Sequence, residues 1–321
     1  MTKKKIWFII GASLVLFSSL AFVIVMSFAG WDFSKLATVK YETREVEISD
    51  SFNKISISLD TADLVLLPSE DEKCKIVATE QEKLTHLVTV EENTLKIKSS
   101  DTFNWYDKIH LFNFGSNKIT VYLPKQSFES LNISTSTGNI NVPQDFSFRS
   151  IDIEVSTADV DCSASSTGSL KIKNTTGNVF VNGIFYASVD LSVSTGDIKL
   201  LDATCVGDVT LKVGTGNATV SNVTCTNFTL DGSTSDVKLS TVLSSGKMNV
   251  KTGTGSITLL GCNASEFDFK ATTGDITGSL RSSKVFDAHA TTGDVSVPPN
   301  VEGAGLCKIR TSTGNIKITI G

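Results

Sequence analysis

Residues 189–200 carry the sequence Val-Asp-Leu-Ser-Val-Ser-Thr-Gly-Asp-Ile-Lys-Leu, and variants of this stretch recur through the C-terminal two thirds of the chain. Its centre is Thr195-Gly196-Asp197-Ile198, a Thr-Gly pair followed by an acidic and a β-branched residue. Ten copies occur at intervals of 19 to 21 residues, which indicates a repeat architecture with one structural unit per copy. Their central residues are Gly138, Ala158, Gly177, Gly196, Gly216, Ser235, Gly255, Gly274, Gly293 and Gly314.

Apolar residues occupy the same positions in every copy. Relative to the central residue, positions −7, −5 and +2 are apolar or Cys in all ten copies, and position +4 is so in all but one, where Gly278 stands. Alternation with a period of two is typical of strands with one buried face. The buried set switches from odd to even positions across the Thr-Gly pair, so the chain must turn there. Gly suits a positive φ at such a turn, and Asp or Asn tolerates or caps it.

Two architectures satisfy this pattern. In a parallel β-solenoid each copy is one coil, Thr-Gly is a corner, and equivalent residues stack about 4.8 Å apart. In an antiparallel meander Thr-Gly would be a two-residue hairpin loop, a place where Asn-Gly or Asp-Gly is preferred. Because the columns are uniform and the copy length varies little, we predict an all-β fold, a single-stranded parallel β-solenoid (β-helix) over residues 131–321 with about 19–20 residues per coil.

The first thirty residues form a membrane signal. Lys3-Lys4-Lys5 precede an uncharged stretch from Ile6 to Gly30, which at 25 residues is long enough to cross a bilayer as a helix. The lysines predict a cytoplasmic tail at 1–5, a transmembrane helix or signal anchor at 6–30, and an extracytoplasmic C-terminal region, so that the protein is a single-pass cell-membrane protein. The alternative is a signal peptide cleaved near Ala29, which would give a secreted protein; the length of the apolar run favours the uncleaved anchor.

Residues 31–130 carry a looser form of the pattern, and we predict that they form an N-terminal β segment and solenoid cap. Thr61-Ala62-Asp63 and its flanking apolar residues match an eleventh copy. Residues 87–97 are typical of strand, turn and strand, and residues 119–123 of a strand closed by Pro124. The irregular stretch from Ser99 to Ser116 suits either a recognition loop or a cap that seals the end of the solenoid. Its aromatic residues are Phe103, Trp105, Tyr106, Phe112 and Phe114.

The order of these elements resembles one family. Val88-Thr89-Val90, Thr94-Leu95-Lys96-Ile97 and the strand that ends at Pro124 come before the Thr-Gly-Asp/Asn repeats, as in the bacterial "putative adhesin" family of unknown function. The resemblance covers roughly residues 45–321. It implies a β-solenoid outside the cytoplasm, behind one membrane helix and associated with envelope-stress signalling. It brings no catalytic residues.

The recurring Asp or Asn after the Gly is best explained by hydrogen bonds to the backbone of the corner. The alternative is calcium binding, because stacked carboxylates such as Asp275 and Asp294 would repel each other and favour a cation. The recurring Thr would suit an ice-binding face only with a second Thr column at position −3. That position holds Thr in few copies: Thr135, Thr252 and Thr311.

Cysteines and histidines do not form a recognisable site in the sequence. There are six cysteines and no Cys-x-x-Cys motif, and the three histidines have no metal-like spacing. Cys205 and Cys225 occupy equivalent positions of successive copies, where stacking would bring them within disulfide range, although two buried thiols are favoured. The residues concerned are Cys74, Cys162, Cys205, Cys225, Cys262, Cys307, His86, His110 and His289.

Charge and motifs limit the possible functions. The chain has 29 basic and 34 acidic residues; without Lys3, Lys4 and Lys5 the balance is 26 − 34 = −8, which argues against a nucleic-acid surface. No Gly-x-Ser-x-Gly or other catalytic motif occurs, so we predict a protein that is not an enzyme and needs no cofactor or metal. We expect a cell-surface binding module that meets membrane lipid through its helix and a protein or glycan through its repeats. The alternative is a regulatory or scaffolding partner of membrane proteins in the cell-envelope stress response.

Overall fold

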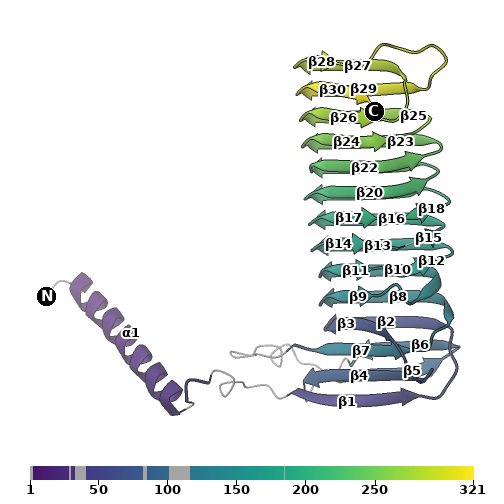
Figure 1. The fold of residues 1–321 in the computed structure, drawn as a ribbon. Coiled ribbons are helices and arrows are strands. Elements are labelled where there is room, and N and C mark those ends of the chain that lie inside the picture. Colours follow the sequence, from purple (N-terminus) through teal and green to yellow (C-terminus); the bar gives the residue numbers. More distant parts are fainter. Residues whose placement is uncertain (1–2, 29, 33–40, 82–84, 101–115, 184) are drawn as a thin grey trace.

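The computed structural model describes residues 3–28, 30–32, 41–81, 85–100, 116–183 and 185–321. They form one helix and a rod of stacked strands (Figure 1). The helix, α1 (Lys3–Phe28), is long and apolar enough to span a membrane. The predicted recognition loop or cap at residues 101–115, with its five aromatic residues, lies outside the described residues, as does His110.

Two sheets run along the rod. Sheet B contains, in spatial order, β5 (His86–Glu91), β6 (Thr94–Ser99), β2 (Lys54–Thr61), β8 (Ser127–Thr137), β10 (Ser147–Thr157), β13 (Ser169–Thr176), β16 (Ser188–Thr195), β19 (Val209–Thr215), β21 (Phe228–Thr234), β23 (Lys247–Thr254), β25 (Glu266–Thr273), β29 (Leu306–Thr313) and β27 (Val285–Thr292), with β12 (Ser165–Ser166) beside β10. Sheet A contains β1 (Tyr41–Ile48), β4 (Cys74–Gln81), β7 (Lys118–Leu123), β3 (Asp63–Pro68), β9 (Ile140–Val142), β11 (Val160–Cys162), β14 (Val179–Val181), β17 (Ile198–Leu201), β20 (Ala218–Cys225), β22 (Val237–Ser244), β24 (Ile257–Cys262), β26 (Ile276–Leu280), β30 (Ile316–Ile320) and β28 (Val295–Ser296), with β15 (Phe185–Tyr186) and β18 (Thr204–Cys205) beside this path.

Each repeat is one coil, made of a sheet B strand, a Thr-Gly corner and a sheet A strand. Successive coils pair in parallel with equivalent residues opposite each other, so that Thr157 pairs with Thr176 and Thr176 with Thr195. The predicted parallel β-solenoid is therefore confirmed, and the antiparallel meander is wrong for the repeats. With 14 strands along the path of sheet A, the rod is about 60 Å long.

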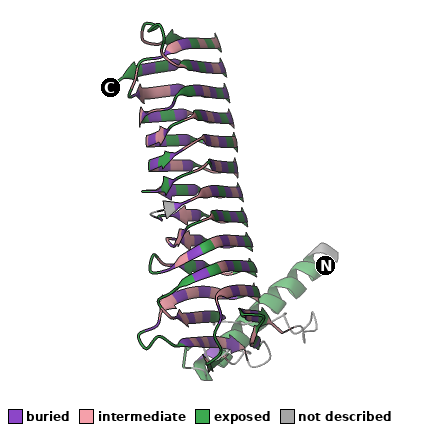
Figure 2. Ribbon diagram, turned by 90° about the vertical axis from the view of Figure 1, so that its right-hand side faces the viewer, coloured by how far each residue is buried: buried purple, intermediate pink, exposed green. Residues whose placement is uncertain are grey.

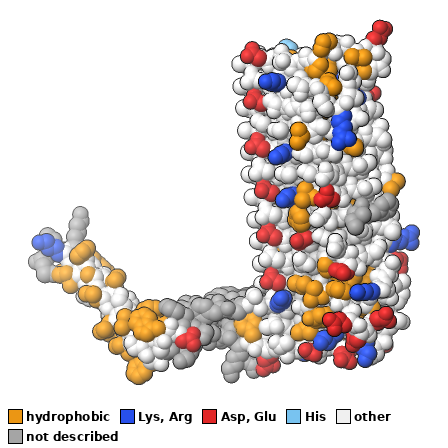
Figure 3. All heavy atoms as spheres, in the orientation of Figure 1, with side chains coloured by type: hydrophobic (Ala, Val, Ile, Leu, Met, Phe, Trp, Pro, Cys, Tyr) orange, Lys and Arg blue, Asp and Glu red, His pale blue; other side chains and the backbone are white. Residues whose placement is uncertain are grey.

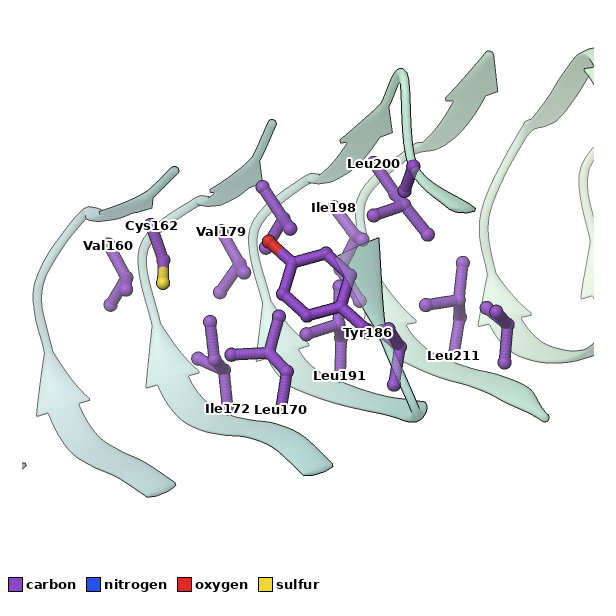
Figure 4. Close-up of a cluster of buried hydrophobic side chains, with 14 of the residues drawn as sticks. Val160, Cys162, Leu170, Ile172, Val179, Tyr186, Leu191, Ile198, Leu200 and Leu211 are labelled. Carbon is purple, nitrogen blue, oxygen red and sulfur yellow. The ribbon is translucent and has the colours of Figure 1, made fainter. Parts of the chain in front are cut away.

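The core lies between the two sheets and follows the predicted columns. Figure 2 shows buried and exposed residues alternating along the strands of every coil. Figure 4 shows one section of this core, in which Ile172 and Leu191 of sheet B face Val179 and Ile198 of sheet A. Each coil also has a second corner, where the chain passes from its sheet A strand to the sheet B strand of the following coil. Tyr186 is fully buried at this second corner, where its hydroxyl donates a hydrogen bond to the carbonyl oxygen of Ala164 at 3.0 Å.

The coils follow chain order in the middle of the rod but not at its ends. At the distal end, the last coil of the chain (β29–β30, the inserted coil) lies between the coil of β25–β26 and that of β27–β28, which we name the end coil. At the N-terminal end, β2–β3 lies between β6–β7 and β8–β9 in the same manner. The match of residues 55–66 to an eleventh copy is confirmed, because β2 and β3 stack in register with β8 and β9.

The N-terminal end of the rod is closed by antiparallel strands. β1 pairs with β4 and β4 with β7 in antiparallel fashion, and β5 and β6 form the hairpin predicted at residues 87–97. Glu92 and Asn93 at its turn both have positive φ, as the favoured two-residue hairpin turn requires. β7 ends at Leu123 before Pro124, as predicted.

Candidate functional site

The Thr-Gly corners form one continuous polar edge of the rod. The Thr at position −1 is exposed in all eleven coils, and none of these hydroxyls makes a side-chain hydrogen bond to a described residue. The Gly that follows has a φ between +120° and +146° in the eight Gly-containing copies. At Gly196 a Cβ atom would lie 2.1 Å from the carbonyl oxygen of Gly177 in the neighbouring coil, so the stacking itself demands Gly there. The edge therefore presents Thr side chains that neither the turn nor the core uses.

The Asp or Asn at position +1 links each coil to the next. The Asn178 backbone N–H donates to Oδ1 of Asp159 at 2.7 Å, and the Asp197 N–H donates to Oδ1 of Asn178 at 3.0 Å. Equivalent bonds recur along most of the rod, including across the inserted coil, where the Asn315 N–H donates to Asp275. The predicted hydrogen bonding of this column to the corner backbone is observed.

Charged and neutral side chains alternate along this column in the order of the stack. The sequence along the rod is Asp63, Asn139, Asp159, Asn178, Asp197, Asn217, Asp236, Ser256, Asp275, Asn315 and Asp294. Figure 3 shows this edge, with acidic side chains separated by uncharged ones. Neighbouring carboxylates are thus two coils, or about 10 Å, apart, at which distance salt largely screens their repulsion.

The order of the coils removes the basis for the calcium site considered from the sequence. It required Asp275 and Asp294 to be neighbours, but the inserted coil places Asn315 between them. Among the residues that the structure describes, no group of three or more His, Cys, Asp or Glu side chains is arranged to hold a metal. Thr135, Thr252 and Thr311 at position −3 are buried and donate to backbone carbonyls, so they add no second exposed Thr column.

The cysteines are structural in character. All six are buried and free, including the neighbouring pair Cys205 and Cys225. Burial raises the pKa of the Cys162 thiol to about 12, and it raises that of Cys205 as well. Cys205 and Ser244 occupy equivalent places at the second corner and donate to carbonyls of the preceding coil, at 3.4 Å to Ala187 and 2.6 Å to Thr226. The thiols are therefore protonated, enclosed groups.

Two buried charged groups also have structural partners. Glu80 is enclosed by the Arg44 guanidinium at 3.0 Å and by Nδ1 of His86 at 2.6 Å, which joins β1, β4 and β5 at the N-terminal end. Lys284 lies at the distal second corner, where its Nζ donates to the carbonyl oxygen of Ala264 at 2.6 Å. Burial lowers the pKa of Lys284. The chain skips one layer between β26 and β27, and the long Lys284 side chain connects this corner to the preceding one.

Two clefts and the distal end are the other surface features. A cleft of about 610 Å³ near the N-terminal end is lined by charged side chains together with Leu67 and Tyr122, and Lys75 lies 5.4 Å from the Tyr122 ring centre. A second cleft, beside it, is lined by residues that include Phe52 and Gln126. At the distal end, Val295 is 44% exposed although it occupies a core column. Sequence reasoning located none of these, since each depends on which coils lie at the ends.

The chain resembles several proteins of known structure. No curated protein matches it. Solved structures that resemble it include a putative adhesin from Bacteroides fragilis (16% identity, TM-score 0.43, covering 87% of this chain and 97% of that one) and a putative lipid binding protein from Parabacteroides distasonis (15%, 0.44, 88% and 98%). The model of one family, described as Toastrack DUF4097, matches residues 52–211 and again 186–320. Since these matches cover most of the chain, the protein belongs to the Toastrack DUF4097 family.

Proposed function

We propose that this protein is a non-enzymatic binding module, a rod anchored in the cell membrane by α1 that holds a protein or glycan outside the cytoplasm. The observation that carries this proposal is the Thr column. An exposed Thr recurs in every coil although its hydroxyl serves neither the turn nor the core. A row of identical polar groups at a spacing of about 4.8 Å suits a partner that is itself extended or repetitive.

The anchor follows from the N-terminal sequence. α1 is apolar throughout after Lys5, and the lysines before it favour a cytoplasmic N-terminus. From Phe28 to Tyr41 the chain can span at most about 45 Å, so β1 marks the membrane-proximal end of the rod. The end coil is then the part farthest along the rod from the membrane.

The test is site-specific photocrosslinking in living cells with the full-length chain. A crosslinking amino acid placed at Thr176, Thr195 or Thr215 should capture one recurring partner, whereas the same group at Lys199 or Lys212, on the flat faces, should not. Equal capture from all five positions would contradict a binding edge. Replacing the three Thr residues by Val retains shape and strand propensity. This triple Val variant should no longer capture the partner from crosslinking positions next to the replaced residues, and its unfolding midpoint should be unchanged.

The aromatic segment remains a second proposed contact. Phe103, Trp105, Tyr106, Phe112 and Phe114 come between β6 and β7 in the sequence. Replacing Trp105 and Tyr106 by Ala should weaken partner capture if the segment is a recognition loop. If it is a cap, the same change should lower the free energy of unfolding instead.

The cleft near Tyr122 favours a second candidate function, a regulatory or scaffolding partner of other membrane proteins. It lies at the membrane-proximal end of the rod and combines Lys73 and Lys75 with Glu47 and Glu70. Crosslinks from Tyr122 to a membrane protein, without crosslinks from the Thr column, would support this function over the binding edge.

A further inference from the structure

The distal end of the rod is an open strand edge. β27 is the last strand of sheet B and pairs only with β29. Its Phe286 N–H points away from β29 and donates to Oδ1 of Asn300 at 2.7 Å, while the Val285 N–H points inward and donates to Gly305. Backbone groups alternate along a strand, so the N–H and C=O of Ala288 and Ala290 also point outward from the rod.

Exposed apolar side chains concentrate at the same end. Of the described residues from β1 onward, the large exposed hydrophobic ones are Leu87, Val206, Leu260, Val295, Val301, Leu306 and Ile320. Four of these seven belong to the last two coils or to the connection between them. Val295 is 44% exposed, whereas the equivalent Ile316 of the inserted coil is 1% exposed. At the end coil, a position that is buried in the core of the other coils is therefore exposed to solvent.

The sequence of β27 is complementary to itself when two copies run antiparallel. With Ala288 opposite Ala288 of a second copy, Asp287 lies opposite His289 and the large Phe286 opposite the small Ala290. Ala288 and Ala290 carry the outward N–H groups, so this register also forms backbone hydrogen bonds. Two contacts with the connection that follows β28 must be exchanged for bonds to the second copy: the Phe286 N–H donates to Oδ1 of Asn300, and the Val301 N–H donates to the carbonyl oxygen of Lys284 at 3.3 Å.

From this geometry we infer that two copies of the protein join end to end through antiparallel pairing of their β27 strands. The symmetry axis passes between the two Ala288 residues, perpendicular to sheet B, so sheet B continues into sheet B of the second copy. The two N-terminal ends then lie at opposite ends of a rod of about 120 Å. Resting on the membrane anchor of the proposed function, such a pair would connect two facing membranes, with the partner-binding edge still free along both rods.

The test uses the full-length chain in vesicles of phosphatidylethanolamine and phosphatidylglycerol, with rods facing outward and two vesicle populations labelled in different colours. Native vesicles should cluster, with a membrane separation of about 120 Å in electron micrographs. His289→Asp places Asp opposite Asp in both of the symmetry-related 287–289 pairs and should weaken clustering about tenfold. Asp287→His should weaken clustering as well, because it places His opposite His and leaves Arg310 of β29 without its carboxylate partner. When vesicles of one colour carry His289→Asp and vesicles of the other colour carry Asp287→His, clustering should return, but only between vesicles of different colour. Each His of one variant then lies opposite an Asp of the other.

Two further variants separate pairing from folding. Ser192→Asp adds the same carboxylate in the same column at mid-rod and should leave clustering unchanged. Ala288→Pro removes an outward N–H that the fold does not use and should abolish clustering. Failure of native vesicles to cluster, clustering that survives Ala288→Pro, or failure of the mixed variants to recover would overturn the inference. Crosslinks from Thr195 to a cellular partner are read independently, so the binding function can stand if the pairing fails.

Discussion

The two ends of the rod stop the stack in different ways. At the N-terminal end, β1 runs antiparallel to β4 and carries Glu42, Arg44, Glu45 and Glu47, charges that discourage a strand edge from pairing with another chain. At the distal end the strands stay parallel, and the last layer offers small apolar residues and exposed Val295. Both ends nevertheless contain a coil inserted out of chain order. The inserted coils therefore hold the outermost coils in place at both ends. Protection of the exposed strand edge against further pairing is provided only by the charged antiparallel strand β1.

The largest effect is expected from removing the inserted coil. Deletion of residues 305–321 takes Cys307, Ile309, Ile316 and Ile318 out of the core. At about 1.5–3 kcal/mol for each buried side chain, the distal end loses roughly 6–12 kcal/mol. The end coil then has no neighbour, so residues 281–304 should lose hydrogen-exchange protection while β23 and β24 keep theirs. Protection retained over β27 would show that the end coil does not depend on the inserted one.

A matched deletion in the middle of the rod should be tolerated. Removal of residues 178–216 takes out two whole coils and joins Gly177 to Asn217, so that Asp159, Asn217 and Asp236 still alternate. Coils of a solenoid contact only their neighbours, and we expect a shorter rod that unfolds cooperatively. Removal of residues 178–196 alone brings Asp159 next to Asp197 and should be less stable than the double deletion. Global unfolding of the double deletion would contradict nearest-neighbour stacking.

Alkaline pH should open both ends through their buried thiols. Burial raises the pKa of Cys74, near the proximal end, and of Cys307, in the inserted coil, from 9.0 to about 12. Above pH 9 the unfolded chain releases these protons and the folded chain retains them, so stability is full below pH 9 and falls as the pH rises toward 12. The loss is on the order of 1–4 kcal/mol per thiol. Cys307→Ala should reduce the slope of unfolding free energy against pH by up to one proton, and an unchanged slope would count against a buried thiol there.

A smaller effect is expected from Lys284. Lys284→Met keeps the apolar stem but removes the bond to Ala264, which should cost about 1–2 kcal/mol. Ser244→Ala removes the bond to Thr226 at a corner in the middle of the rod and should cost about 1 kcal/mol. Hydrogen exchange distinguishes the two variants. Lys284→Met should loosen only the last two coils, and Ser244→Ala only the coils of β20 to β23. Loosening of the same region in both would contradict the assignment of Lys284 to the skipped layer.

Much of the fold could be predicted because the same pattern of corner and core residues recurs in every repeat. The Thr-Gly corners, the core columns and the hairpin at residues 87–97 each depend on local alternation and turn chemistry, which neighbouring residues in the chain determine. The roles of Cys205 and Cys225 followed less directly. Their shared position was visible, but only the second corner shows that a thiol replaces the hydroxyl of Ser244 as a donor to the preceding coil.

The order of the coils at the ends could not be read from the columns. Nearly every coil presents apolar residues at the same positions to its neighbour, so the columns are equally satisfied by chain order and by insertion. One signal was present in the sequence. In chain order Asp275 is followed by Asp294 and then Asn315, which breaks an alternation that holds for the rest of the repeats, and inserting the last coil restores it.

The smallest predicted effect tests this alternation directly. Asn315→Asp keeps the acceptor for the Asp294 N–H but places a third carboxylate between Asp275 and Asp294, about 4.8 Å from each. Repulsion from these two neighbouring carboxylates should lower the free energy of unfolding of the variant by about 1–2 kcal/mol at low salt, and by much less at high salt. Asp294→Asn, at the open end with one neighbour, should change stability by less than half as much. Added calcium should stabilise the Asn315→Asp variant and not the native chain. If the coils instead followed chain order, Asn315→Asp would add one repulsion, with Asp294, and Asp294→Asn would remove one, with Asp275. The two salt-dependent changes would then be similar in size and opposite in sign.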